Sequence, residues 1–281
     1  MRVIEYKKIV ETVKQLCLKA AFELPLDMLN AVSFAYKKEK SKIGKKILCY
    51  IAENAEIAKK DKIPICQDTG IAVFFVEIGN NVVIKGGNLE DAINYGTSLG
   101  YRQGFLRASI VDDPLYKRIN TKTNTPAVIH YNFIKGDKLT ITFAPKGGGS
   151  ENITSLYMLK PSDGEAGVIS SVVETIKEAG AKPCPPVIVG IGIGGTAETA
   201  VYLSKKALLR PITKKNKNKK YSELEKNILN RINKTGIGPQ GFGGKITALS
   251  VHIETFPCHI ATLPVAVSVS CHALRYAKAV L

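Results

Sequence analysis

The 281-residue sequence lacks any long hydrophobic run. Its apolar stretches are short and interrupted by charged residues or glycines, and none approaches the roughly 20 residues that a membrane-spanning helix needs. The first ten residues, MRVIEYKKIV, also lack the apolar core of a secretory signal. The 45% hydrophobic and 23% charged residues are typical of globular proteins. We therefore expect a soluble, cytoplasmic protein without a membrane partner.

Acidic residues are also few. The 24 Asp and Glu stand against 40 Lys and Arg, which gives a formal net charge of +16. This excess fits a nucleic-acid-binding face, a surface that attracts anionic small molecules or an acidic partner, or a lysine-rich solvated surface. The densest basic run, 214–220 (KKNKNKK), has no aromatic residue among its lysines and no nucleic-acid-binding motif around it. It predicts an exposed loop, and we do not expect nucleic acid as a partner.

No CxxC pair occurs among the six cysteines, which argues against a zinc finger. Disulfides are rare inside cells, so the thiols could be core residues, a nucleophile or metal ligands. Cys17 and Cys49 lie in predicted helices among apolar residues, and we expect them in the core. Cys66, Cys184 and Cys271 each lie at the boundary of a predicted element, where loops present ligands. Three thiolates suit an iron–sulfur cluster with one open iron.

The periodicity predicts a mixed α/β protein without repeats or an interdomain linker. A helical part covers residues 1–60, and a mixed α/β part with antiparallel strand pairs covers residues 61–281. Helices are expected over 6–22, 25–37, 41–59, 88–106 and 163–179, in a segment that ends near 209, in a short helix capped by Ser222 and Glu225, and from His272 onward. Strands are expected over 71–78, 82–87, 185–192, 246–254 and 264–270, with a hairpin of 127–134 and 139–145.

Two glycine-rich segments resemble nucleotide-binding motifs only in part. Gly190, Gly192 and Gly195 fit GxGxxG between a strand and a helix, but the acidic residue expected at the end of a second strand is missing. The segment GPQGFGGKI has Pro239 and Ile246 where a phosphate-binding loop needs Gly and Ser or Thr. Tight turns between packed elements are the main expectation for both segments, although their backbone N–H groups could still face an anion.

Four segments together resemble the class I fumarase family: CQDTG at 66–70, APKGGGSENIT at 144–154, CPPVIVGIGIGGTAE at 184–198, and the stretch from GIGPQGFGGK to SCHALR at 236–275. The resemblance runs in order from about Lys59 to the last residue. The family includes the α subunits of two-subunit fumarate hydratases and of L-tartrate dehydratase. Membership would imply a [4Fe–4S] cluster held by Cys66, Cys184 and Cys271, with a fourth iron that binds substrate. Cys258 lies outside the pattern and is expected to be a structural thiol.

The same resemblance implies residues on the substrate side. Gln67, Asp68, Arg107 and Gly149 match positions that contact substrate, and Asp68 and His259 match a catalytic pair in which the histidine orients the aspartate. Single-chain members of the family continue into a second domain. We therefore expect the remaining groups, including the base at C3, to come from a separate β subunit, in an α2β2 heterotetramer.

The expected activity is the reversible hydration of fumarate to L-malate (EC 4.2.1.2), which would appear only with the β subunit. An L-tartrate dehydratase α subunit, or that of another dicarboxylate hydro-lyase, is the nearest alternative. Two alternatives outside the enzymes are a non-catalytic cluster-binding protein and a nucleic-acid-binding module.

Overall fold

The chain folds into two units, and neither is continuous in sequence. The computed structural model describes residues 1–281 and shows an α/β fold with mixed sheets. Unit 1 comprises Met1–Pro25, Ala55–Gly148 and Arg275–Leu281, and unit 2 comprises Leu26–Asn54 and Gly149–Leu274. One division between them falls within helix α3 (Lys42–Asp61). No helix combines the length and the apolar character that a membrane crossing requires.

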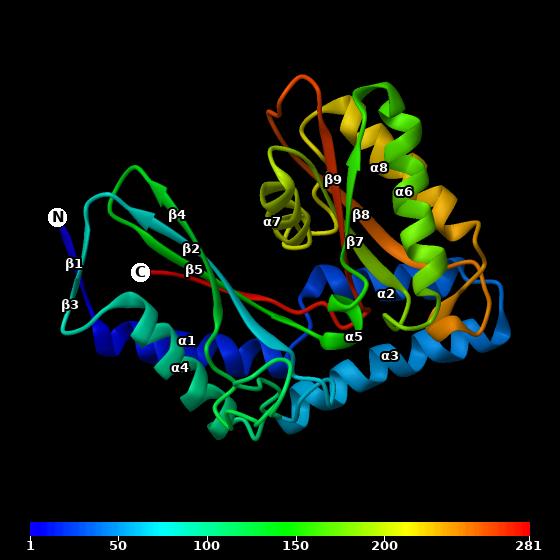
Figure 1. Cartoon of the computed structure of the whole chain (residues 1–281). Coiled ribbons are helices and arrows are strands. Elements are labelled where there is room, and N and C mark those ends of the chain that lie inside the picture. Colours follow the sequence, from blue (N-terminus) through cyan, green and yellow to red (C-terminus); the bar gives the residue numbers. More distant parts are fainter. The chain divides into compact units, whose positions relative to one another are not determined.

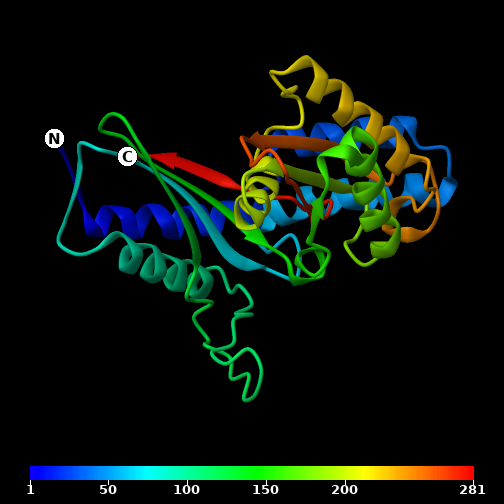
Figure 2. The ribbon, with the colours of Figure 1, turned by 45° about the horizontal axis from the view of Figure 1, so that its top comes forward.

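Unit 1 is built on a four-stranded sheet of order β10-β5-β2-β4. Helix α1 packs along helix α4 and against β5 and β10, and Figures 1 and 2 both show the two helices side by side. Buried side chains such as Ile9, Val13, Ile93 and Phe143 join helices and sheet in one core. The bounds are α1 (Tyr6–Phe22), β2 (Ile71–Gly79), α4 (Leu89–Gln103), β4 (Val128–Ile134), β5 (Leu139–Lys146) and β10 (Ala277–Val280), beside a parallel pair of β1 (Arg2–Glu5) and β3 (Val82–Lys85). In Figure 2 the long loop 104–127 extends away from this sheet.

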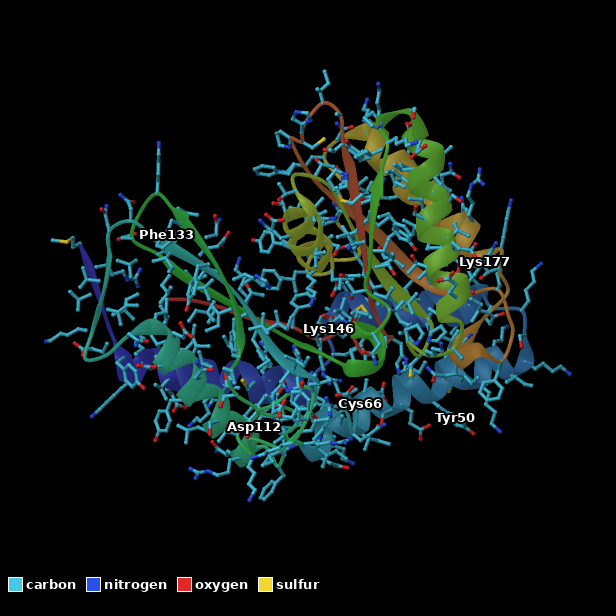
Figure 3. All side chains as sticks on the ribbon, in the orientation of Figure 1. Tyr50, Cys66, Asp112, Phe133, Lys146 and Lys177 are labelled. Atoms are coloured by element: carbon cyan, nitrogen blue, oxygen red, sulfur yellow. The ribbon has the colours of Figure 1, made fainter.

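The predicted hairpin of 127–134 with 139–145 is wrong, because β2 lies between these strands. β2 is parallel to β4 and antiparallel to β5. Its Phe74 and Val76 are fully buried. Phe133, which is labelled in Figure 3, lies on the edge strand β4 and is 77% exposed. The most apolar strand gains most from the central position, since both of its edges are then paired and the face that carries Phe74 and Val76 packs into the core. Two hydrogen bonds close this arrangement: Gly136 N donates to Asn80 Oδ1, and Asn81 N donates to Gly136 O.

Unit 2 contains a second four-stranded sheet, of order β6-β9-β7-β8. Helix α7 covers one face, and helices α6 and α8 cover the other (Figure 1). A smaller cluster of Val32, Leu48 and Ile246 packs α2 and the first part of α3 onto this unit. The bounds are α2 (Leu26–Lys38), α5 (Gly148–Glu151), β6 (Ser155–Leu159), α6 (Gly164–Ala179), β7 (Val187–Gly194), α7 (Ala197–Ala207), α8 (Lys219–Asn233), β8 (Ala248–Phe256) and β9 (Leu263–Ser270), with short 3-10 turns at Pro161–Asp163 and Pro239–Gly241.

The glycines of the GxGxxG segment are explained by packing. A Cβ added at Gly190 would come within 2.1 Å of Ser204 O, and one at Gly192 within 2.0 Å of Ala200 O, both on α7. The alternate residues Val189 and Ile191 point into the core with α6 and α8. The sequence therefore uses glycine where the helix backbone approaches the strand most closely, and the motif needs no nucleotide to account for it.

Three other local predictions are wrong. Helix α8 begins at Lys219 behind the N-cap Asn218, whose side chain accepts from Lys220 N at 2.9 Å, so Ser222 and Glu225 lie inside the helix. The chain from His272 forms a turn and then β10, because the last strand completes the sheet of unit 1 instead of forming a helix. Cys49 is exposed on α3, whereas the burial expected for Cys17 is confirmed.

We expect Gly192→Ala to lower the free energy of unfolding by at least about 2 kcal/mol, because the new methyl group must push α7 off β7. Urea unfolding measures this loss. Gly236→Ala is the control: its Cβ meets nothing within 4 Å, and only its φ of +72° is unfavourable, at a cost of about 1 kcal/mol. Equal losses in both variants would show that α7 does not depend on a glycine at position 192.

Candidate functional site

Cys66 lies in the loop that follows α3, as Figure 3 shows, and the residues around it are closely held. The carboxylate of Asp68 accepts one hydrogen bond on each oxygen, from Gly70 N at 3.0 Å and from Gly148 N at 2.8 Å. The guanidinium of Arg275 donates to Asp68 O at 2.6 Å. The Asp68 side chain therefore has a defined orientation two residues after Cys66.

Two buried side chains of unit 1 support the same loop from behind. The hydroxyl of Tyr101 lies 2.9 Å from Thr69 O and 3.0 Å from Gly70 O, and Asn124 Nδ2 donates to Gly70 O at 3.1 Å. Tyr101 is 2% exposed and Asn124 0%. Burial raises the pKa of Tyr101 well above its ordinary value, so the hydroxyl keeps its proton and remains a donor. Thr69 Oγ1 in turn donates to Arg107 O at 2.7 Å.

Unit 1 thus brings together four of the predicted site residues. Cys66 and Asp68 are partly exposed, and Gln67 and Arg107 are exposed. The Cys66 thiol donates to Gln67 Oε1 at 3.4 Å. The hydrogen bond from Thr69 Oγ1 to the carbonyl oxygen of Arg107 fixes the backbone of Arg107 beside the loop. These side chains can therefore reach a ligand while their backbone is fixed.

In unit 2, Cys184 and Cys271 lie at one end of the sheet. Cys184 comes just before β7 and Cys271 directly after β9, and these strands are antiparallel, with Ile188 opposite Ser270. His272 links the two segments, because its N and Nδ1 atoms lie 3.5 and 2.9 Å from Cys184 O. Cys184 is exposed and has a left-handed φ of +54°. Such strain in a non-glycine residue persists only where the surroundings impose it.

Gly149 lies near the Cys184 segment, whereas His259 lies elsewhere in unit 2. A Cβ on Gly149 would be 3.3 Å from Lys182 O, two residues before Cys184. His259 lies in the exposed loop between β8 and β9, at the end of the sheet opposite to Cys184 and Cys271. Cavities of about 580 and 460 Å³ flank this loop, and His259 lines both. Asp68 belongs to unit 1 and His259 to unit 2, so their pairing stays a prediction.

The cysteines fit an iron–sulfur cluster by their chemistry. No three His, Cys, Asp or Glu side chains form a ready-made metal centre, and Cys66 belongs to a different unit from Cys184 and Cys271. The three thiols are nevertheless free of disulfides and at least partly exposed, as cluster ligands must be before the cluster is inserted. Cys17 differs, because complete burial raises the pKa of its thiol far above the ordinary value.

Comparison with known sequences identifies the family. The sequence model described as fumarate hydratase (Fumerase) matches residues 10–280. The chain belongs to the fumarate hydratase family. The resemblance to class I fumarases found in the sequence is confirmed, and with it the assignment to a family of hydro-lyases.

Curated relatives of the chain carry tartrate dehydratase names. A Methanocaldococcus jannaschii protein, whose name gives it provisionally as an L(+)-tartrate dehydratase subunit alpha, is 44% identical over 278 residues, which is 96% of each chain. The L(+)-tartrate dehydratase subunit alpha of Escherichia coli K12 is 34% identical over 272 residues, 95% of this chain and 89% of that protein. The protein of the same name from Shigella sonnei matches to the same extent.

The structure of this fumarate hydratase family member reveals further residues that support the cysteine loops and that no sequence motif indicates. Tyr101, Asn124 and Arg275 hold the backbone of the Cys66 loop, and the backbone N–H of His272 holds Cys184 O. Their partners are backbone carbonyls distant in sequence, so no local motif signals them. His272 alone had a signal, because it directly follows Cys271.

We expect Tyr101→Phe to destabilise unit 1 by about 1–3 kcal/mol, because buried carbonyls lose their donor. Reaction of the Cys66 thiol with an alkylating reagent should become faster, since its loop is less restrained. Urea unfolding and mass spectrometry measure the two effects. Tyr95→Phe on the same helix is the control, because Tyr95 is 54% exposed. Unchanged stability and Cys66 reactivity in Tyr101→Phe would show that the hydroxyl does not hold the loop.

Proposed function

We propose that this chain is the α subunit of a two-chain hydro-lyase that reversibly hydrates fumarate to L-malate. A [4Fe–4S] cluster would be held by Cys66, Cys184 and Cys271. The observation that carries the proposal is the loop at Cys66. There a carboxylate in a fixed orientation stands two residues from a partly exposed thiol, in a chain that matches the fumarate hydratase family over nearly its whole length.

The chemistry to be supplied is the loss of water from malate and its reverse. The C2–O and C3–H bonds break, the double bond forms between C2 and C3, and hydroxide must leave as water. The cluster, when bound, would supply a Lewis acid next to the substrate oxygen. Asp68 would give the proton that turns the leaving hydroxyl into water, and would take it back from the attacking water in hydration. The base that accepts the proton from C3 would come from the β subunit.

Arg107, Gln67 and the N–H group of Gly149 would bind the substrate. A dicarboxylate needs donors at both ends, and a guanidinium can hold one carboxylate through two charge-assisted hydrogen bonds. The exposed side chain of Arg107 and the fixed backbone beneath it suit this role. His259 would orient Asp68, as the family resemblance implies.

The names of the three relatives, each a subunit alpha, support a separate β subunit for this chain. We propose an α2β2 assembly in the cytoplasm. These same names favour L(+)-tartrate as a second candidate substrate. Tartrate differs from malate by one hydroxyl at C3, so the same elimination and the same groups of this chain would serve both reactions.

We expect serine at Cys66, Cys184 or Cys271 to abolish cluster binding, because a hydroxyl is a poor iron ligand. Protein purified without oxygen should be brown and carry about four irons per chain. Iron analysis and electron paramagnetic resonance of the oxidised form measure the loss. Serine at Cys17, Cys49 or Cys258 is the matched control and should leave the iron content unchanged. A cluster that survives the triple variant would refute this ligand set.

We expect the co-purified complex with the β subunit to hydrate fumarate, and Asp68→Asn to lower kcat by about 10²–10⁴ with iron content unchanged. Asparagine keeps one acceptor oxygen but cannot transfer the proton. Fumarate, L-malate and L(+)-tartrate should be assayed side by side. Turnover of tartrate alone would favour the second candidate. Near-normal kcat in Asp68→Asn would assign the proton transfer to another group.

A further inference from the structure

Gln240 lies between the segments that carry two of the cysteines. Its backbone N–H donates to Pro185 O at 2.7 Å, and its side-chain Nε2 donates to the same oxygen at 2.9 Å. Nε2 also lies 3.0 Å from Nδ1 of His272. Pro185 directly follows Cys184, and His272 directly follows Cys271. One side chain of unit 2 therefore touches the residue next to each cysteine.

The three groups converge on one ring nitrogen. Nδ1 of His272, which faces Gln240, is also 2.9 Å from Cys184 O. The amide of Gln240 has two N–H donors, one for Pro185 O and one for Nδ1 of His272, which accepts it in the tautomer that leaves Nδ1 unprotonated. In that tautomer the donor to Cys184 O is the backbone N–H of His272. A carboxylate of the same shape has no donor and would place an oxygen against the Pro185 carbonyl. The site therefore requires an amide at position 240 and not only a side chain of that length.

The loop that carries Gln240 is itself fixed. The buried carboxylate of Glu39 accepts hydrogen bonds from Lys245 N and Ile246 N, each at 2.9 Å. At the other end of the loop Gly238 N donates to Thr247 Oγ1 at 3.1 Å. Gln240 itself has a left-handed φ of +52°, which a residue of this type rarely adopts unless its surroundings impose it. The amide is thus presented from a rigid support.

We propose that Gln240 is a positioning residue that sets the spacing between Cys184 and Cys271. This spacing in turn determines how firmly the chain retains the cluster. The role rests on the proposed function, since it concerns the same cluster. Gln240 does not contact the cluster or the substrate; it acts through Pro185 and His272. Groups of this kind that orient metal ligands change metal retention by roughly 10–100-fold when they are replaced.

The test compares iron loss from the full-length chain, purified without oxygen, to an excess of a ferrous chelator. We expect Gln240→Glu and Gln240→Ala to lose iron about tenfold faster than the wild type. Gln240→Asn should behave like the alanine variant, because asparagine tolerates the left-handed backbone but its amide is one methylene shorter. Phe242→Ala is the control: Phe242 is 67% exposed in the same loop, and its variant should match the wild type.

Two further readouts separate positioning from general loss of structure. Oxidation removes the iron that no cysteine holds, and the three-iron form that remains should show an altered electron paramagnetic resonance spectrum in Gln240→Glu, while the iron-free chain still unfolds in one cooperative thermal transition. In the iron-free chain, a short bifunctional thiol reagent should cross-link Cys184 to Cys271 in lower yield in the Gln240 variants than in Phe242→Ala. Equal iron loss and equal cross-linking across all variants would overturn the proposal. If the wild type binds no iron, the proposed function fails, and the cross-linking yields still decide the role of Gln240.

Discussion

The arrangement of unit 2 depends on the hydrogen bonds that the buried carboxylate of Glu39 accepts. Glu39 is 2% exposed and accepts hydrogen bonds from the N–H groups of Lys40, Ser41, Lys245 and Ile246. Burial alone would raise the pKa of Glu39, but these hydrogen bonds together outweigh it and hold the pKa below its ordinary value. The charge is therefore kept at neutral pH, and its contribution to stability is lost only as the pH falls through the lowered pKa.

Both units hold their cysteine segments by the same physical means. In unit 1, Tyr101, Asn124 and Arg275 donate to backbone carbonyls of residues 68–70. In unit 2, Gln240 donates to Pro185 O, and His272 N lies 3.5 Å from Cys184 O. In each case side chains fix the backbone and leave the thiol accessible. Loops without regular structure thus gain a fixed geometry, since backbone carbonyls next to the cysteines have specific donors.

Regular apolar spacing made several elements predictable. Helix α1 occupies the predicted residues 6–22, and the buried strand β7 follows from the run VIVGIGIG. The GxGxxG pattern was ambiguous, because glycines serve close packing and phosphate binding alike. The place of β2 between β4 and β5 could not be read locally, since it depends on the competition among all strands of unit 1 for the central position. Glu39, Tyr101 and Arg275 gave no signal either, because their partners lie as many as 207 residues away.

The pairing of β10 with β5 has a consequence for the order of assembly on the ribosome. β5 ends at Lys146, but its neighbour β10 spans Ala277–Val280. The β5 side of the sheet of unit 1 therefore stays unpaired until the whole of unit 2 has been synthesised. Unit 2 can close first, although unit 1 begins earlier in the chain. During this interval the eight-residue edge of β5 is a template for pairing with other nascent chains, and β10 then covers it and leaves an edge of only four residues.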